Sequence, residues 1–131
     1  YELTLEISAI LKKELENNPS LYGQNVGYAR KMAWYEHCLC GKKVDISCLS
    51  IGRARILHLP AEVFVDYQLA AKKRRPDLFV AVAAYGEYGP GYIGTEKAYK
   101  EGGYETSETA SNVHPETERT LKPAIFKLLE D

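Results

Sequence analysis

The stretch from Ile56 to Glu105 constrains the fold most, because it holds two strand-like apolar runs that each end in a polar turn. The first run leads into Leu59-Pro60-Ala61-Glu62, where Pro60 suits the first turn of a helix and Glu62 would lie in that turn. The second run, Leu78 to Ala84, reads LFVAVAA and predicts a central strand buried on both faces. In α/β folds, ligands bind at the carboxyl ends of such strands. We therefore expect functional residues in the turns that follow both runs.

The turn after the second run extends from Tyr85 to Tyr92 and contains three glycines, one proline and three tyrosines. Glycine allows close backbone approach, and tyrosine adds a large apolar ring with a polar tip, so this loop can wall a pocket. It has neither the Gly-x-Gly-x-x-Gly pattern nor a Walker lysine, so it is not a phosphate-binding loop. Beyond it, Thr95 predicts the cap of a short helix that Gly102 and Gly103 end.

The segments before and within this region also have predicted helices and strands. Residues 1–41 are predicted to be helical, with an amphipathic helix from Leu3 to Leu15 and a second helix from Tyr28 to Leu39 that Gly41 stops. Residues 42–105 form the strand and helix region that holds the site, and two short strands between Val44 and Leu57 can pair as a hairpin.

Residues 106–131 are predicted to form a loop and a C-terminal helix that starts near His114, with Pro123 either kinking that helix or dividing it. These elements predict an α/β fold, with α+β as the alternative, in which helices pack around a small mixed sheet. We expect either a single domain or the C-terminal portion of a larger one. Tyr1 stands in place of an initiator Met, which indicates a fragment or a processed product.

Composition limits the partners. With 131 residues, 45% of them apolar, the chain can bury one core. A net charge of −1 gives no overall attraction for nucleic acid or an anionic membrane, and no apolar run is long enough for a transmembrane segment. The four cations from Lys72 to Arg75 fit the C-terminus of a helix, where they complement the helix dipole.

The three cysteines, Cys38, Cys40 and Cys48, do not have the spacing of a metal site or of a disulfide framework. They favour buried or half-buried thiols, and they leave the cellular compartment open.

Two motifs in this order, with a strand between them, resemble the end of the catalytic domain of neutral/alkaline, non-lysosomal ceramidases. They are Leu59-Pro60-Ala61-Glu62 and Tyr88-Gly89-Pro90-Gly91-Tyr92-Ile93-Gly94-Thr95, followed by Tyr99 and Glu101-Gly102-Gly103-Tyr104-Glu105. The resemblance implies a zinc amidohydrolase in which Glu62 and Tyr92 are metal ligands and Tyr104 lies near the scissile carbonyl. It also implies a small-molecule or lipid N-acyl amide substrate, sphingolipid-like in chemistry, and a secreted or periplasmic location.

The same resemblance implies that this chain holds only part of the site. The family's two His ligands and its active-site Ser segment have no counterpart here, and His37, His58 and His114 do not stand in matching contexts. The expected partner is therefore the remainder of the catalytic domain, and the chain alone should be inactive. From the residues alone, two alternatives stay open: a noncatalytic α/β module that binds a ligand with its Tyr/Gly-rich loop, and an interaction domain that completes a larger fold.

Overall fold

The computed structural model describes Asn17, residues 22–86 and residues 89–130. The chain divides into two compact units, residues 1–42 and residues 43–131. The first contains helix α2 (Tyr22–Leu39), which starts earlier than the predicted Tyr28 and ends, as predicted, at a left-handed Gly41 with φ of 66°. The amphipathic helix predicted from Leu3 to Leu15 lies outside the described residues.

The second unit has an α/β fold built on a three-stranded mixed sheet in the order β1-β2-β4. Strands β1 (Ser47–Ile51) and β2 (Ala54–His58) form the predicted antiparallel hairpin, and β2 pairs in parallel with β4 (Phe79–Ala83). Gly52 turns the hairpin with φ of 55°. The mixed sheet of the sequence prediction is therefore confirmed.

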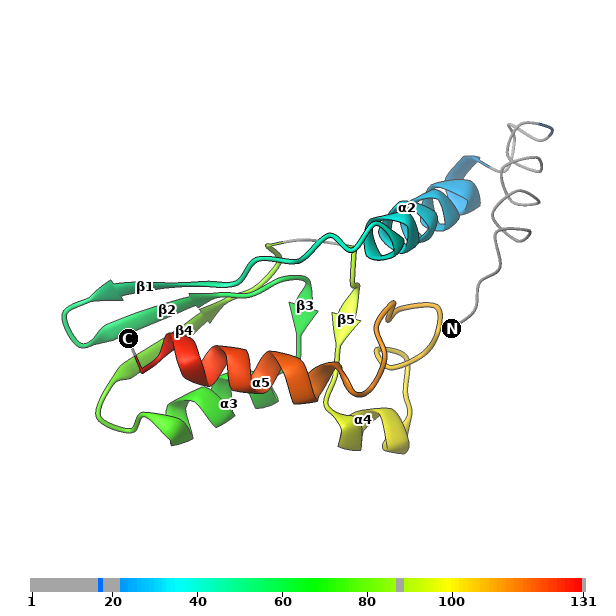
Figure 1. Cartoon of the computed structure of the whole chain (residues 1–131). Helices are drawn as coiled ribbons and strands as arrows, with labels where there is room; N and C mark the ends of the chain where they lie inside the picture. Colours follow the sequence, from blue (N-terminus) through cyan, green and yellow to red (C-terminus); the bar gives the residue numbers. More distant parts are fainter. Residues whose placement is uncertain (1–16, 18–21, 87–88, 131) are drawn as a thin grey trace. The chain divides into compact units, whose positions relative to one another are not determined.

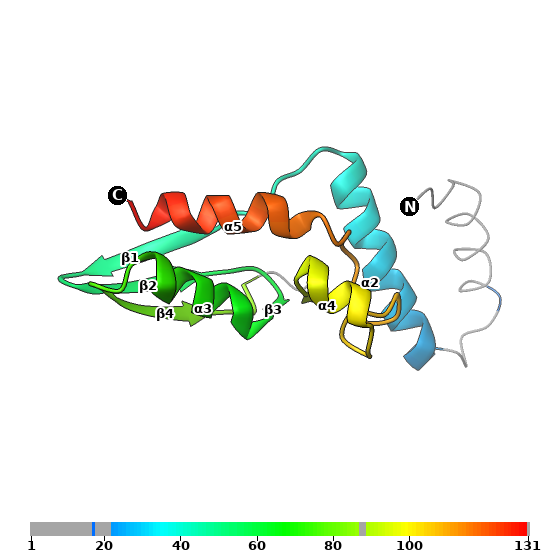
Figure 2. The same cartoon turned by 90° about the horizontal axis from the view of Figure 1, so that it is seen from below.

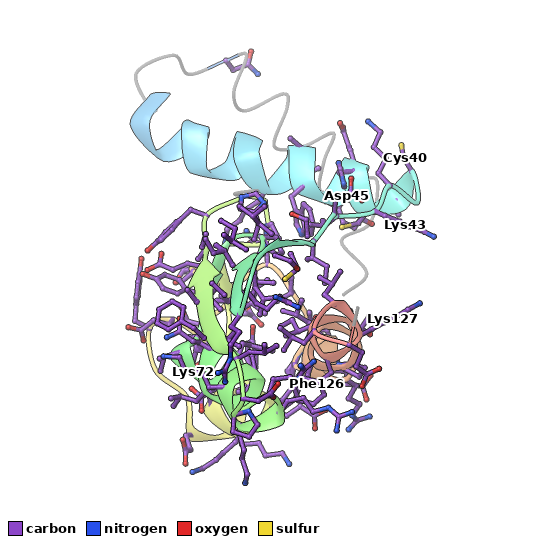
Figure 3. All side chains as sticks on the ribbon, turned by 90° about the vertical axis from the view of Figure 1, so that its left-hand side faces the viewer. Cys40, Lys43, Asp45, Lys72, Phe126 and Lys127 are labelled. Atoms are coloured by element: carbon purple, nitrogen blue, oxygen red, sulfur yellow. The ribbon has the colours of Figure 1, made fainter. Side chains whose placement is uncertain are left out.

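Helix α3 (Val65–Arg74) connects β2 to β4, and helix α5 (Thr117–Leu128) packs beside it against the same face of the sheet (Figures 1 and 2). Between the helices and the sheet lies the core, which consists of Leu57, Leu59, Ala61, Tyr67, Ala71, Val80, Ile93, Leu121, Ile125 and Leu129. Lys72, Lys73 and Arg74 occupy the last turn of α3, which confirms the prediction for this cationic run. Lys72, labelled in Figure 3, is exposed.

A second, two-stranded parallel sheet joins β3 (Glu62–Val63) to β5 (Tyr92–Ile93) (Figure 1). Helix α4 (Glu96–Glu101) follows β5. As predicted, the Thr95 hydroxyl caps α4 by accepting the Ala98 N–H at 3.2 Å, and Gly102 ends the helix with φ of 78°. In the described residues, no helix is both long and apolar enough to cross a membrane.

Two predictions around the site-bearing runs were wrong. Glu62 does not lie in a helical first turn, because Ala61 reverses the chain with φ of 57°, Glu62 enters β3, and α3 begins only at Val65. The Leu78–Ala84 run is not a central strand buried on both faces. Its strand, β4, lies at the edge of the sheet formed by the described residues, where it pairs with β2, and Phe79 is 69% exposed.

Two further predictions needed correction. Pro123 does not divide the C-terminal helix, because α5 runs through it as one helix; burial of Leu121 and Ile125 on its inner face offsets the hydrogen bond that proline removes. Cys38 and Cys40 are exposed thiols rather than buried ones, since they lie at the end of α2, and Cys48 is half-buried.

Candidate functional site

Backbone pairing between β3 and β5 brings Glu62 and Tyr92 together. The two residues are direct partners across the parallel pair, so their side chains leave the same face of this small sheet. The Glu62 N–H donates to the Gly91 carbonyl at 3.0 Å, and the Phe64 N–H donates to the Ile93 carbonyl at the same distance. Thirty positions apart in the sequence, the two predicted metal ligands are neighbours because their backbones are hydrogen-bonded.

The Glu62 and Tyr92 side chains interact directly. A hydrogen bond with the Glu62 side chain, followed by partial burial, raises the pKa of the Tyr92 phenol, and the nearby charge of Glu105 acts in the same direction. A carboxylate beside a phenol favours the neutral phenol, because ionisation would place two negative charges together.

Tyr104, the third predicted site residue, lies against Tyr92. The two ring centroids are 6.2 Å apart and the rings meet edge-to-face at 74°, an arrangement that aromatic pairs favour. Tyr104 is 67% exposed, so its phenol remains accessible to a bound molecule. All three residues named from the sequence therefore form one cluster, with Glu105 beside it.

Ala61 places Glu62 through an unusual backbone conformation. A φ of 57° is costly for a residue with a side chain, yet Ala61 is 1% exposed and its carbonyl accepts the Tyr85 N–H at 2.7 Å. Alanine suits this position because its small methyl group fits the buried space where the chain changes direction sharply. The turn between β2 and β3 therefore fixes the direction in which Glu62 leaves the sheet.

We predict that Ala61→Val lowers the free energy of unfolding by about 2 kcal/mol, because a β-branched side chain at positive φ adds strain and overfills a buried position. Ala61→Gly, which accepts this φ without strain, is expected to stay within about 1 kcal/mol of the parent. Chemical denaturation of all three proteins measures the difference. Equal stabilities for the valine and glycine variants would contradict the proposed strain at this turn.

Segment 110–112 holds the strand that carries Tyr92. The Tyr92 N–H donates to the Ala110 carbonyl at 3.1 Å, and the Asn112 N–H donates to the Pro90 carbonyl at 2.9 Å. The Asn112 side chain also donates to the Gly89 carbonyl at 3.0 Å. Each of the six carbonyls from Gly89 to Gly94 accepts a hydrogen bond, three of them from side chains. This density of bonds preorganises the Tyr92 backbone.

Ser111 and Tyr99 form a directed chain of hydroxyls behind Tyr92. The Ser111 hydroxyl lies 2.9 Å from the Tyr92 carbonyl, which can only accept, so Ser111 donates its single proton there. The Tyr99 hydroxyl, 2.6 Å from Ser111 Oγ, must then donate to the serine. Ser111 is a buried polar residue, and both of its hydroxyl roles are filled. The sequence analysis did not identify this support, because a serine in a polar loop carries no distinctive signal.

The cluster fits a partial zinc site. A carboxylate and a phenol both supply oxygen ligands that zinc accepts, and a metal ligand has to give up its proton when zinc binds. Within the described part of the chain, no group of three or more His, Cys, Asp or Glu side chains could hold a metal ion. His58 ends β2, and its ring carbon Cε1 would lie 2.9 Å from a Cβ added to Gly86.

A surface groove lies apart from this cluster. The groove, of about 580 Å³, lies between α4 and α5, and its lining residues are Glu96, Lys97, Lys100, Glu118, Arg119, Lys122, Pro123 and Phe126. None of the three predicted site residues contributes to it.

No protein-family model, curated protein or solved structure matches this chain. The likeness to ceramidases therefore rests on the two motifs and on the residues they contain.

Proposed function

We propose that this chain supplies one wall of the active site of a ceramidase-like zinc amidohydrolase. The observation that carries the proposal is the direct pairing of Glu62 with Tyr92, with the Tyr104 ring against Tyr92. The two motifs that suggested these roles are far apart in sequence, and the fold of this chain brings their functional residues into contact.

Each residue has a chemical role in this proposal. Glu62 and Tyr92 hold zinc from one side, and β5 keeps Tyr92 in place through its backbone hydrogen bonds. When bound, zinc activates water and polarises the amide carbonyl of the substrate. Tyr104 carries an accessible phenol that can donate a hydrogen bond to the oxyanion that develops on that carbonyl. The reaction is hydrolysis of an N-acyl amide, with a sphingolipid-like lipid as the proposed substrate class.

The proposal requires a partner. Catalytic zinc usually takes three protein ligands, and Glu62 with Tyr92 gives two. The other ligands are proposed to be histidines from the remainder of the catalytic domain, either in the same polypeptide or in a separate chain. We use the term complete protein for the natural polypeptide or complex that contains this chain together with those ligands. This chain alone is expected to be inactive.

Glu62→Gln in the complete protein tests the assignment. The variant keeps the shape of the side chain but removes its charge, so we expect zinc affinity and hydrolysis of an N-acyl lipid each to fall by about 100-fold or more. Glu105→Gln is the matched control, because it removes a neighbouring carboxylate that is not a proposed ligand. Zinc content by mass spectrometry and product release measure the two effects. If Glu62→Gln retained its zinc, the ligand assignment would be wrong.

The exposed Tyr104 ring supports a second candidate, a noncatalytic module that binds a ligand by aromatic stacking. In that case, this chain alone would bind a soluble saccharide without zinc, and Tyr104→Ala would abolish binding. Calorimetric titration of this chain with and without a chelator separates the two candidates.

A further inference from the structure

Tyr85, which lies just after β4, has a backbone conformation that is unusual for a bulky residue. Its φ is 67°, in the left-handed region that the described residues otherwise reserve for glycines and Ala61. A side chain is strained there, because its Cβ lies too close to the following carbonyl oxygen. Tyr85 is 52% exposed, so core packing does not explain the strain. Strain of this kind is concentrated at active sites and ligand contacts.

The turn that contains Tyr85 is bound to the end of β2 and to the turn after it. The Tyr85 N–H donates to the Ala61 carbonyl at 2.7 Å, and the Gly86 N–H donates to the Leu59 carbonyl at 3.1 Å. A Cβ on Gly86 would lie 2.9 Å from a carbon of the His58 ring, so glycine allows the two turns to come this close. These contacts hold the Tyr85 backbone in place.

The peptide unit between Ala61 and Glu62 connects Tyr85 to the candidate site. Its carbonyl accepts the Tyr85 N–H, and its N–H donates to the Gly91 carbonyl at 3.0 Å. The carbonyl and the N–H of a trans peptide unit point in opposite directions, so these two hydrogen bonds lie on opposite sides of the chain. Because Gly91 immediately precedes Tyr92, Glu62 follows a peptide unit held between the segments that carry Tyr85 and Tyr92.

Tyr85 thus adds a third tyrosine to the neighbourhood of Glu62. Tyr92 pairs with Glu62 directly, and Tyr104 lies edge-to-face against Tyr92. Tyr85 and Tyr104 are both more than half exposed, so both rings offer surface to a bound molecule. A tyrosine ring supplies a large apolar contact area and loses little conformational entropy on binding. Aromatic residues therefore come from both backbone segments that flank the peptide unit before Glu62.

We propose that Tyr85 is a specificity-determining residue whose ring contacts the acyl chain of the N-acyl amide. This inference rests on the proposed function, since it names the substrate group that this part of the site binds. The acyl chain begins one bond from the carbonyl carbon that is attacked, so its first methylene groups are the apolar part of the substrate nearest to the zinc. Tyr85 is fixed one peptide unit away from the proposed ligand Glu62, within reach of these groups. A glycine would relieve the strain but would offer no ring to the substrate.

Tyr85→Gly and Tyr85→Ala form a matched pair for the test. Both remove the ring, but only glycine accepts a φ of 67° without strain. In this chain, we expect Tyr85→Gly to melt about 3 °C or more above Tyr85→Ala. Equal melting temperatures would show that Tyr85 is not strained and would remove the reason for assigning it a role in binding.

Hydrolysis by the complete protein tests the contact itself. Two N-acyl amides of the same amine serve as substrates, one with a long saturated acyl chain and one with an acetyl group. For the long-chain amide, Tyr85→Gly and Tyr85→Ala should each raise KM by about 10-fold and leave kcat within about twofold, because the ring binds the chain equally in the ground state and the transition state. For the acetyl amide, KM should stay within about twofold. Tyr85→Phe keeps the ring and should match the parent with both substrates.

Zinc content, measured on the same samples, separates this inference from the proposed function. Full zinc and an unchanged KM for the long-chain amide in Tyr85→Gly would overturn the inference and leave the proposed function standing. Loss of zinc from Tyr85→Gly would also overturn it, because Tyr85 would then position Glu62 rather than contact the substrate. An equal rise of KM in Tyr85→Phe would assign the contact to the hydroxyl instead of the ring. A parent protein that binds no zinc and hydrolyses neither amide would refute the proposed function, and this inference with it.

Discussion

Gly91→Ala is expected to lower the free energy of unfolding by about 3 kcal/mol or more and to displace Tyr92. Gly91 has φ of 67°, which an alanine adopts at a cost of about 1 kcal/mol. A Cβ at this position would lie 2.3 Å from the Ala110 carbonyl oxygen, far inside van der Waals contact. Because the obstacle is backbone, segment 110–112 would have to move away and weaken its hydrogen bonds to residues 89–92.

Gly52→Ala separates the two contributions to this effect. Gly52 also has a positive φ, of 55°, but a Cβ there would meet nothing within 4 Å. We expect this control to cost about 1 kcal/mol, which is the backbone strain alone. Urea denaturation of both variants gives the two free energies, and the tyrosine ring signals in nuclear magnetic resonance report the position of Tyr92. Equal losses in the two variants would show that segment 110–112 does not constrain Gly91.

Elements with strong local signals could be predicted from the sequence. The α4 helix begins and ends where Thr95 and Gly102 indicated, because a hydroxyl cap and a left-handed glycine act on the adjacent backbone. The end of α2 at Gly41 and the hairpin around Gly52 have the same explanation. In each case the decisive interaction lies within a few residues of the signal.

The failures occurred where distant pairing decides the structure. Pro60 is a local helix signal, but the Glu62 N–H pairs with Gly91, which is 29 positions later, and this pairing places Glu62 in a strand. The Leu78–Ala84 run predicted a strand with two buried faces, whereas α3 and α5 pack against one face of β4. An apolar run indicates that a strand can be buried. Which faces of the strand are buried depends on the elements that pack against it.

The residues of the candidate site also differ in whether the sequence could identify them. The motifs predicted the roles of Glu62, Tyr92 and Tyr104, and these three residues have side chains with distinctive chemistry. Ser111 and Tyr99 support Tyr92 through its carbonyl, which any hydroxyl donor of suitable position could do. Such a role depends on the path of the chain between residues 92 and 111, and composition does not encode that path.

Tyr67→Ala is the second variant with a large expected effect, a loss of about 3–5 kcal/mol of unfolding free energy. Tyr67 is 1% exposed in the core, and its hydroxyl donates to the Gly94 carbonyl at 2.9 Å. It therefore joins α3 to the segment that carries Tyr92. Tyr67→Phe keeps the ring and leaves the buried Gly94 carbonyl without its donor, so its expected loss is smaller, about 1–3 kcal/mol. Equal losses for the two variants would mean that the ring contributes little beyond its hydroxyl.

The buried Tyr67 phenol also makes stability depend on pH in the alkaline range. Burial, with the charge of Glu118 as a further cause, raises the pKa of Tyr67 well above its usual value near 10. Above pH 10, the unfolded chain loses this proton while the folded protein keeps it, so the folded state binds more protons and stability falls as pH rises. Urea denaturation at a series of pH values should show a shallower alkaline decline for Tyr67→Phe than for the parent. Parallel declines would place the responsible proton on another group, and Tyr92, whose pKa is also raised, would be the next tyrosine to replace.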